Sequence, residues 1–177
     1  YTVLSDPAAR ADYLEELVHG PKHKVDINQV IEAEGAYQEG RALLKVRRFS
    51  AAARALKRAI ELSPEEPEYL TDYAWALFKS GPEIPQFRTQ ALEILLTARE
   101  MNPGSDRVHL SLGHIYLAEE KERQAEKAFE MAVQANPDCT EALRELRLIN
   151  LRREQAAQGK GLFSGLLKKD KKDKKDK

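Results

Sequence analysis

A repeating pattern of prolines and small residues constrains this sequence more than any other feature. Three segments end alike, in Ser-Pro or Asn-Pro, and their prolines are Pro64, Pro103 and Pro137. These prolines lie 39 and then 34 residues apart. Alanines upstream repeat the same two spacings, at Ala52, Ala91 and Ala125. A period of about 20–50 residues is typical of solenoids, in which each unit buries its apolar side against a neighbouring unit.

A second set of small residues locates an insertion in the middle unit. Gly40, Ala74 and Gly113 are spaced by 34 and then 39 residues, which is the reverse order. Five extra residues must therefore lie between Ala74 and Ala91. Residues 80–85 read Ser-Gly-Pro-Glu-Ile-Pro. Because glycine and proline are typical of turns, we predict a lengthened turn between the two helices of this unit.

The residues between these markers predict two antiparallel helices in each unit. Small side chains let helix backbones approach closely, while bulky apolar side chains fill the space between them. The first unit has both kinds, at Gly40, Ala52, Ala59, Leu43, Phe49, Leu56 and Ile60. The third unit repeats them at Gly113, Ala125, Ala132, Leu112, Tyr116, Phe129 and Val133. Each proline is expected to end the second helix of its unit.

The 34-residue period, with its small residues, aromatics and terminal proline, resembles the tetratricopeptide-repeat (TPR) family. The resemblance implies an all-α fold, a right-handed superhelix of antiparallel helix pairs, and a role in binding proteins rather than in catalysis. The three TPR units are expected at residues 33–66, 67–105 and 106–139. Residues 20–32 would hold a linker and the start of the first TPR helix.

One more amphipathic helix is predicted after Pro137. Leu143, Leu146 and Ile149 share one side of it, and arginines surround that side. A solenoid needs an end cap with a polar outer surface, so residues 138–158 are expected to be a capping helix. Cys139, the single cysteine, is expected to be a small buried or half-buried residue at the start of this helix.

In TPR arrays the first helix of each unit lines a concave surface that binds peptides. The resemblance implies that ten residues bind a partner there: Tyr37, Arg41, Leu44, Trp75, Phe78, Lys79, Arg107, Leu110, His114 and Leu117. This set predicts an apolar and aromatic groove, suited to an apolar helix or to an extended peptide with bulky side chains. The alternative for Trp75 and Phe78 is that they pack between units.

One TPR subclass clamps the terminal carboxylates of chaperones with lysine, asparagine and arginine. The matching positions here are Tyr37, Arg41, Asp72, Arg107 and Ser111. Because Asp72 would repel a carboxylate, we expect that this chain lacks the clamp.

The first residues carry a second, shorter resemblance. Residues 1–13 include Leu4-Ser5-Asp6-Pro7, Arg10 and Tyr13, and residues 1–19 resemble the end of a J-domain. J-domains act on heat-shock chaperone ATPases through a His-Pro-Asp tripeptide, which does not occur in this sequence. The resemblance therefore implies a co-chaperone-like parent protein whose activity would reside upstream. The alternative is a helix–turn–helix with similar capping residues.

The sequence ends in a low-complexity segment. Residues 159–177 begin with glycines, leucines and a phenylalanine, and the last ten residues hold seven Lys and three Asp. We expect these residues to be disordered. Leu162, Phe163, Leu166 and Leu167 could still contact a membrane surface, dock on a partner or fold back into the groove.

Composition excludes several classes of function. The formal net charge is zero, and without the last ten residues it is −4, so no basic surface for nucleic acid is expected. No phosphate-binding loop, nucleophile motif or set of metal ligands occurs, so we expect no enzyme, no cofactor and no metal. A single cysteine favours a reducing compartment, and we predict the cytoplasm. The oligomeric state is left open, and a self-associating structural module is an alternative role for the chain.

Overall fold

Between residues 26 and 172 the chain forms consecutive helices joined by short turns, and this part of it contains no strand. The computed structural model describes residues 7, 10–11, 13–14 and 26–172, with side chains as far as Ala156. The helices are α2 (Ile27–Lys45), α3 (Phe49–Leu62), α4 (Pro67–Ser80), α5 (Pro85–Met101), α6 (Asp106–Ala118), α7 (Glu122–Ala135) and α8 (Thr140–Lys172).

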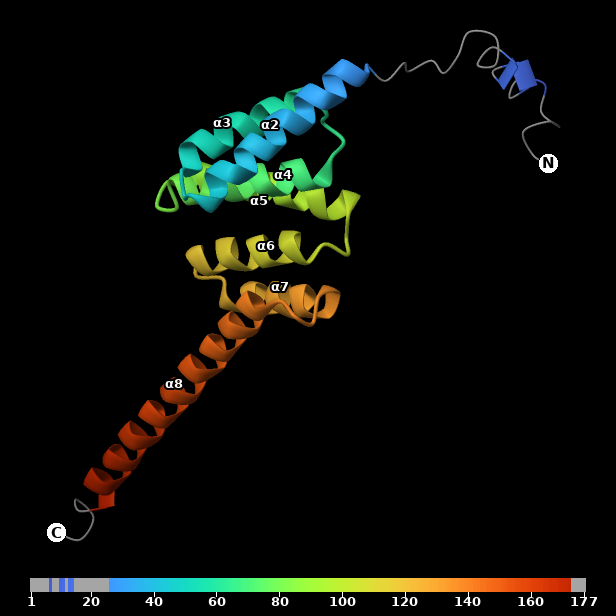
Figure 1. Ribbon diagram of the computed structural model, residues 1–177. Helices are drawn as coiled ribbons and strands as arrows, with labels where there is room; N and C mark the ends of the chain where they lie inside the picture. Colours follow the sequence, from blue (N-terminus) through green and yellow to red (C-terminus); the bar gives the residue numbers. More distant parts are fainter. Residues whose placement is uncertain (1–6, 8–9, 12, 15–25, 173–177) are drawn as a thin grey trace.

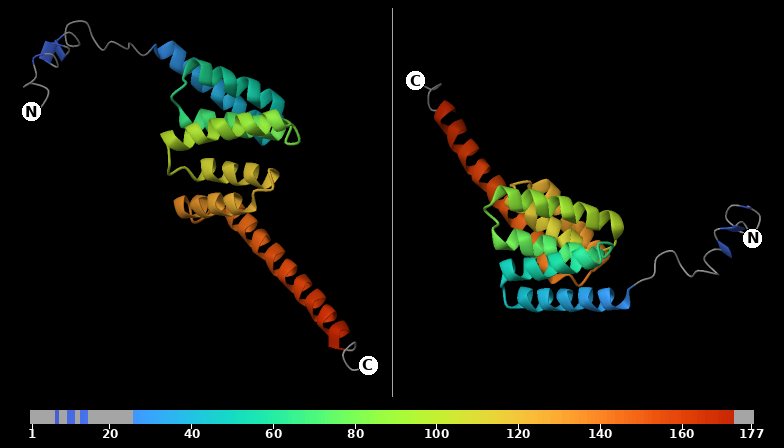
Figure 2. Two further views of the ribbon diagram at one scale, coloured as in Figure 1. Left: turned by 180° about the vertical axis from the view of Figure 1, so that it is seen from behind. Right: turned by 90° about the horizontal axis from the view of Figure 1, so that it is seen from above.

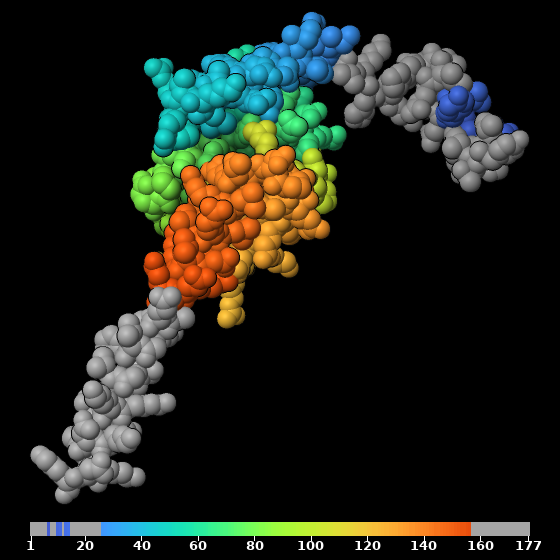
Figure 3. Space-filling model, turned by 60° about the horizontal axis from the view of Figure 1, so that its bottom comes forward, coloured from blue at the N-terminus to red at the C-terminus, as the bar shows by residue number. Residues whose placement is uncertain are grey.

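The helices stack as antiparallel pairs, α2 with α3, α4 with α5 and α6 with α7 (Figure 1). Figure 2 shows the same layers from behind and from above, with α8 leading away from the stack. In the space-filling view the first unit and the last helices lie at opposite ends, with the middle unit between them (Figure 3). The three units and the capping helix that the repeat predicts are thus present.

The helix ends follow local sequence rules. Helices α3, α5 and α7 end at Leu62, Met101 and Ala135, each two residues before one of the repeated prolines. The Asp26 side chain accepts a hydrogen bond from the Asn28 backbone N–H at 3.0 Å, which caps the start of α2. The predicted role of the prolines as stop signals is therefore confirmed.

The five-residue insertion adds more helix than turn, so the predicted long turn is only partly right. The connection from α4 to α5, residues 81–84, is only slightly longer than the equivalent connections in the first and third units, residues 46–48 and 119–121. Helix α5 has 17 residues, compared with 14 in α3 and in α7. Pro85 explains the difference, because its fixed φ and missing N–H suit the first helical position.

The repeated glycines allow two helices to touch within a unit. A methyl group added at Gly40 would collide with the Leu56 side chain, and one added at Gly113 would collide with the Phe129 ring. Leu56 and Phe129 are completely buried at these contacts. The predicted close approach of helix backbones is confirmed at both positions.

We therefore expect the substitution Gly113→Ala to destabilise the fold, by about 1–3 kcal/mol, because the new methyl group overpacks the Phe129 ring. Gly35→Ala is the matched control, since a methyl group there would meet nothing within 4 Å. That control should stabilise the fold by about 0.5–1 kcal/mol through helix propensity. Urea denaturation measures both changes, and equal effects of the two substitutions would contradict the packing described.

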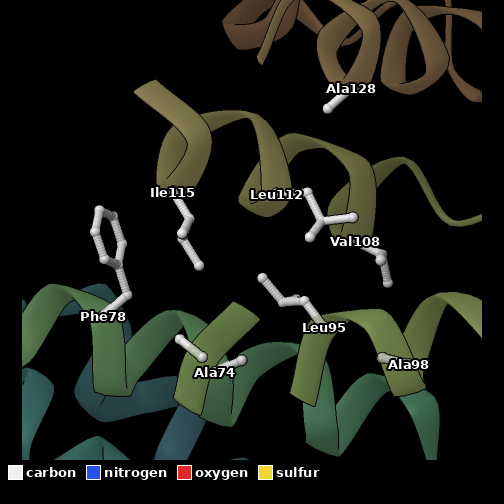
Figure 4. Close-up of a cluster of buried hydrophobic side chains, with 9 residues drawn as sticks. Ala74, Phe78, Leu95, Ala98, Val108, Leu112, Ile115 and Ala128 are labelled. Carbon is white, nitrogen blue, oxygen red and sulfur yellow. The ribbon is translucent and has the colours of Figure 1, made fainter. Parts of the chain in front are cut away.

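The largest cluster of buried side chains lies where the second unit meets the third. Phe78, Leu95, Leu112 and Ile115 belong to it, and Figure 4 shows them pointing into the space between α4, α5 and α6. Figure 4 also shows Phe78 of α4 beside Ile115 of α6. Because this cluster draws on both units, it joins neighbouring repeats into one core.

Helix α8 packs on α7 and continues to Lys172, whereas composition predicted disorder after residue 158. Arg153 of α8 fixes the contact, since its guanidinium donates to both carboxylate oxygens of Glu126 at 2.6 and 2.5 Å. The helical backbone beyond residue 158 has a physical reason: leucine and lysine favour helix, and each glycine there costs only about 1 kcal/mol.

The region that resembles a J-domain falls mostly outside the described residues. Residues 7, 10–11 and 13–14 are helical, and the rest of residues 1–19 is not described. The J-domain interpretation therefore stays a prediction.

Candidate functional site

The first helices of the three units, α2, α4 and α6, form one side of the stack, which we call the inner face. Helix α4 contacts both α2 and α6. A cleft of about 120 Å³ opens between α4, α6 and the start of α8, and we call it the central cleft. Its lining consists of Thr71, Asp72, Trp75, Arg107, Leu110, Ser111 and Glu141.

Three of the ten predicted partner-binding residues, Trp75, Arg107 and Leu110, line the central cleft. His114 lies beside them, with its ring 5.3 Å from the ring of Trp75. The Lys79 ammonium lies 5.2 Å from the centre of the same indole ring. Leu117 is half-buried beside the cluster of buried residues around Phe129. The structure thus brings the residues from the second and third units together around Trp75.

The three predicted residues of the first unit do not line the central cleft, although Tyr37 lies next to the Asp72–Arg107 pair at its edge. Tyr37 is buried and stacks on Tyr69, with 4.3 Å between the ring centres. The Arg41 guanidinium lies over the Tyr37 ring at 5.6 Å. Leu44 is half-buried and packs against the core of the first unit. Tyr37 is therefore a structural residue, whereas Arg41 keeps part of its surface available.

Phe78 does not belong to the groove. It is 5% exposed and packs in the cluster between the second and third units (Figure 4). Trp75, one helical turn earlier, is half-buried and lines the central cleft. Of the two alternatives for this aromatic pair, Phe78 packs between units only, whereas Trp75 both lines the cleft and packs against the same cluster.

Asp72 and Arg107 form an ion pair at the base of the central cleft. The Arg107 guanidinium donates to Oδ1 of Asp72, which is only 3% exposed. Burial lowers the pKa of Arg107, but the hydrogen bond and charge of Asp72 outweigh it and hold the pKa above its ordinary value. Arg107 therefore stays charged, and its guanidinium is paired with the Asp72 carboxylate.

Two tyrosines connect the first unit to the second. Tyr37 Oη donates to Oε2 of Glu68 at 3.3 Å, and Tyr69 Oη donates to Oε2 of Glu34 at 2.9 Å. Burial and the nearby Asp72 charge raise the pKa of Tyr37 to about 12. Both phenols therefore stay protonated near neutral pH and keep α2 fixed beside α4.

His114 and Glu141 close the other side of the cleft. His114 Nε2 lies 3.1 Å from Oε1 of Glu141. Burial lowers the pKa of His114, and the charges of Glu141 and Glu145 offset part of this effect. His114 is therefore neutral at pH 7, so its contact with Glu141 is a hydrogen bond and not an ion pair.

Sequence reasoning missed Glu141 and treated Asp72 and Ser111 only as departures from the carboxylate clamp. Glu141 comes from the first turn of α8, which we predicted only as a cap. The position of Glu141 in the sequence could have indicated this placement. The capping helix of a solenoid begins next to the first helix of the final unit, which here is α6. Asp72 carried a signal too, since a carboxylate is rare at a buried helix position.

A larger cleft lies elsewhere in the described part of the chain. It has a volume of about 680 Å³ and lies between α5, α6 and α7. Leu112, Tyr116, Ala128 and Met131 give it apolar walls. None of the ten predicted partner-binding residues lines this cleft.

Two other kinds of site are absent from the described residues. No group of three or more potential metal ligands lies together among them. No helix within residues 26–172 is both long enough and apolar enough to cross a membrane.

Comparison with known proteins identifies the repeats. Two family profiles, both described as Tetratricopeptide repeat, match residues 37–81 and 88–149. The Small glutamine-rich tetratricopeptide repeat-containing protein 2 of Mycosarcoma maydis is 26% identical over 106 residues. This match covers 60% of the chain but 29% of the relative, so the chain spans less than a third of that relative's length.

Solved structures show the same fold. The Sgt2 TPR domain from Aspergillus fumigatus is 22% identical, with a TM-score of 0.62 over 72% of this chain and 82% of that one. The first TPR domain of Spaghetti (RPAP3), bound to the HSP90 peptide SRMEEVD, is 21% identical, with a TM-score of 0.61 over 71% of this chain and 95% of that one. The tetratricopeptide repeat itself is a protein-interaction scaffold rather than a catalytic fold. The chain belongs to the tetratricopeptide-repeat family, and its repeats form such a scaffold.

Proposed function

We propose that the inner face binds a segment of a partner polypeptide, with Trp75 and Leu110 as its main apolar contacts. The observation that carries this proposal is the half-buried Trp75, the single tryptophan of the chain, in a cleft that also offers charged and polar groups. Tryptophan in a partly enclosed pocket is a frequent anchor of protein interfaces. Neighbouring polar groups can fix the direction and register of a bound segment.

A short peptide is a ligand of suitable size. The first TPR domain of Spaghetti was solved with an HSP90 peptide, and its fold resembles that of this chain. We do not propose a terminal carboxylate as the ligand here. Arg107 already donates to Asp72, and a carboxylate entering the central cleft would meet the charges of Asp72 and Glu141.

We expect Trp75→Ala and Leu110→Ala each to weaken peptide binding, because each removes an apolar contact at the cleft. The test uses random heptapeptides displayed on phage and selected on the wild-type chain. Peptides from this selection should bind the Trp75→Ala variant more than about tenfold more weakly, by fluorescence anisotropy. Met101→Ala is the matched control, because Met101 is an exposed apolar residue at the end of α5, outside the inner face.

Circular dichroism should show the same helix content in all three variants. If the selected peptides bound the wild type and the Trp75→Ala variant equally well, the inner face would not be the binding site.

We further propose that this scaffold serves a co-chaperone-like protein of the cytoplasm. The support is the resemblance of residues 1–13 to the end of a J-domain, together with the chaperone peptide bound by the Spaghetti domain. Contact of residues 159–177 with a membrane, and self-association, remain predictions. Liposome flotation with and without residues 159–177 tests the first of these, and sedimentation at several concentrations tests the second.

A further inference from the structure

The base of the central cleft contains a buried acceptor without a donor. Asp72 is 3% exposed, and Arg107 bonds only one of its carboxylate oxygens. The other oxygen, Oδ2, has no hydrogen-bond partner among the described residues. A buried carboxylate oxygen is costly to leave without a hydrogen bond, particularly at a charged group. Asp72 lines the cleft but Oδ2 itself is covered, so a rotation of the carboxylate is needed to bring this acceptor to a donor in the cleft.

The charges around this oxygen favour a positive ligand. The lining of the central cleft contains two carboxylates, Asp72 and Glu141, and one cation, Arg107. An adjoining cleft of about 220 Å³ adds Glu68 and Asp106, and it shares the same Arg107. Arg107 is held by Asp72, and the partner of Glu141 is a histidine that is neutral at pH 7. Negative charge therefore exceeds positive charge along these two clefts.

The walls of the central cleft suit a long side chain with an apolar stem. Trp75 and Leu110 supply the apolar surface, while Asp72 and Glu141 supply acceptors. The Lys79 ammonium already lies 5.2 Å from the centre of the Trp75 ring, so we assign the indole to packing against the apolar stem and not to binding the charged end. A cleft of about 120 Å³ has room for roughly four water molecules, which is enough for the end of one side chain.

We propose that the central cleft binds the side chain of a lysine or arginine in the partner polypeptide. Trp75 and Leu110 pack against the apolar stem, and the Glu141 carboxylate, together with Oδ2 of Asp72 once the Asp72 carboxylate has rotated toward the cleft, accepts hydrogen bonds from the charged end. This inference rests on the proposed binding of a polypeptide at the inner face. It goes further because it states which kind of residue the partner presents there.

The test uses two kinds of synthetic heptapeptide. One set of peptides is acetylated and amidated, and in these peptides a single Lys, Arg, Gln or Glu is placed in turn at each position of a leucine sequence. The comparison peptide is SQMEEVD with a free carboxylate, which is the HSP90 peptide SRMEEVD with its arginine replaced by glutamine. Binding to the full chain is measured by fluorescence anisotropy at low and high salt. We expect the best Lys or Arg peptide to bind about tenfold more tightly than its Gln counterpart.

Two isosteric substitutions locate the acceptors. Asp72→Asn and Glu141→Gln should each remove most of the preference for Lys or Arg over Gln while leaving apolar binding in place. Glu141 is about half exposed, so Glu141→Gln keeps the test valid even if Asp72→Asn fails to fold. Glu83→Gln is the matched control, because it removes one exposed carboxylate in the connection between α4 and α5.

The outcomes separate this inference from the proposed function. A preference for Lys or Arg that persists in both Asp72→Asn and Glu141→Gln would overturn the inference. The inference would also be overturned if SQMEEVD or the Glu peptides bound in a Trp75-dependent way in place of the Lys and Arg peptides, although the proposed function would then stand. If no peptide bound in a Trp75-dependent way, both the inference and the proposed function would fail.

Discussion

The substitution Phe129→Ala is expected to destabilise the fold by about 3–5 kcal/mol, the largest effect of any single change discussed. Phe129 is completely buried, fills the space beside Gly113 and contacts the His114 ring edge-on, with 5.4 Å between ring centres. Its loss would leave a cavity between α6 and α7, because neighbouring helices relax only partly to fill it. Urea denaturation followed by circular dichroism measures the change.

Leu143→Ala is the matched control for Phe129→Ala. Leu143 is a large apolar residue that is 42% exposed on α8, so its truncation should change the free energy of unfolding by less than about 1 kcal/mol. A loss of similar size in the two variants would contradict the assignment of Phe129 to the core of the third unit.

Arg107→Met should have the second largest effect, a destabilisation of about 2–3 kcal/mol. The substitution keeps an apolar stem but leaves the Asp72 carboxylate buried without its partner, which is costly in a protein interior. We place the loss below that of a fully buried pair, because the Arg107 side chain is 43% exposed.

The double variant Asp72→Asn with Arg107→Met separates the charge effect from the packing effect. The neutral amide removes the uncompensated charge, so the double variant should recover most of the stability that Arg107→Met loses. If the double variant were as unstable as Arg107→Met alone, the ion pair would not be what holds Asp72 in place.

Much of the fold follows from the sequence because the repeat reports packing directly. Small residues recur where helices touch, and prolines recur where helices end, so Gly113 and Pro137 each mark a physical constraint that the structure confirms. The insertion was harder to interpret. Proline is compatible with a turn and with the first position of a helix, and at Pro85 the helix prevails.

The candidate site was less accessible from the sequence. Trp75 and Phe78 lie three residues apart on α4, yet one lines the cleft and the other is in the core. The helical period shows which side of a helix a residue occupies, but it does not show where the next helix packs against that side. Phe78 lies beside Ile115 of the next unit and is buried there (Figure 4). Glu141 enters the cleft from α8, and no repeat position predicts that placement.

The ion pair between Asp72 and Arg107 also needed the structure. The two residues are 35 positions apart on the first helices of neighbouring units, so the repeat places them near each other. Sequence reasoning considered each as a separate position of a carboxylate clamp. Their pairing changes what the cleft offers, since it occupies the arginine and leaves an acidic oxygen.

The central claim, that the inner face binds a polypeptide segment, is tested most directly by the fluorescence of Trp75. It is the single tryptophan of the chain, so its emission reports on the central cleft alone. A heptapeptide selected on the wild-type chain is added until anisotropy shows saturation. We predict that Trp75 emission changes in intensity or wavelength with the same midpoint as the anisotropy. Saturable binding with unchanged Trp75 emission would contradict the claim and direct attention to the larger cleft between α5, α6 and α7.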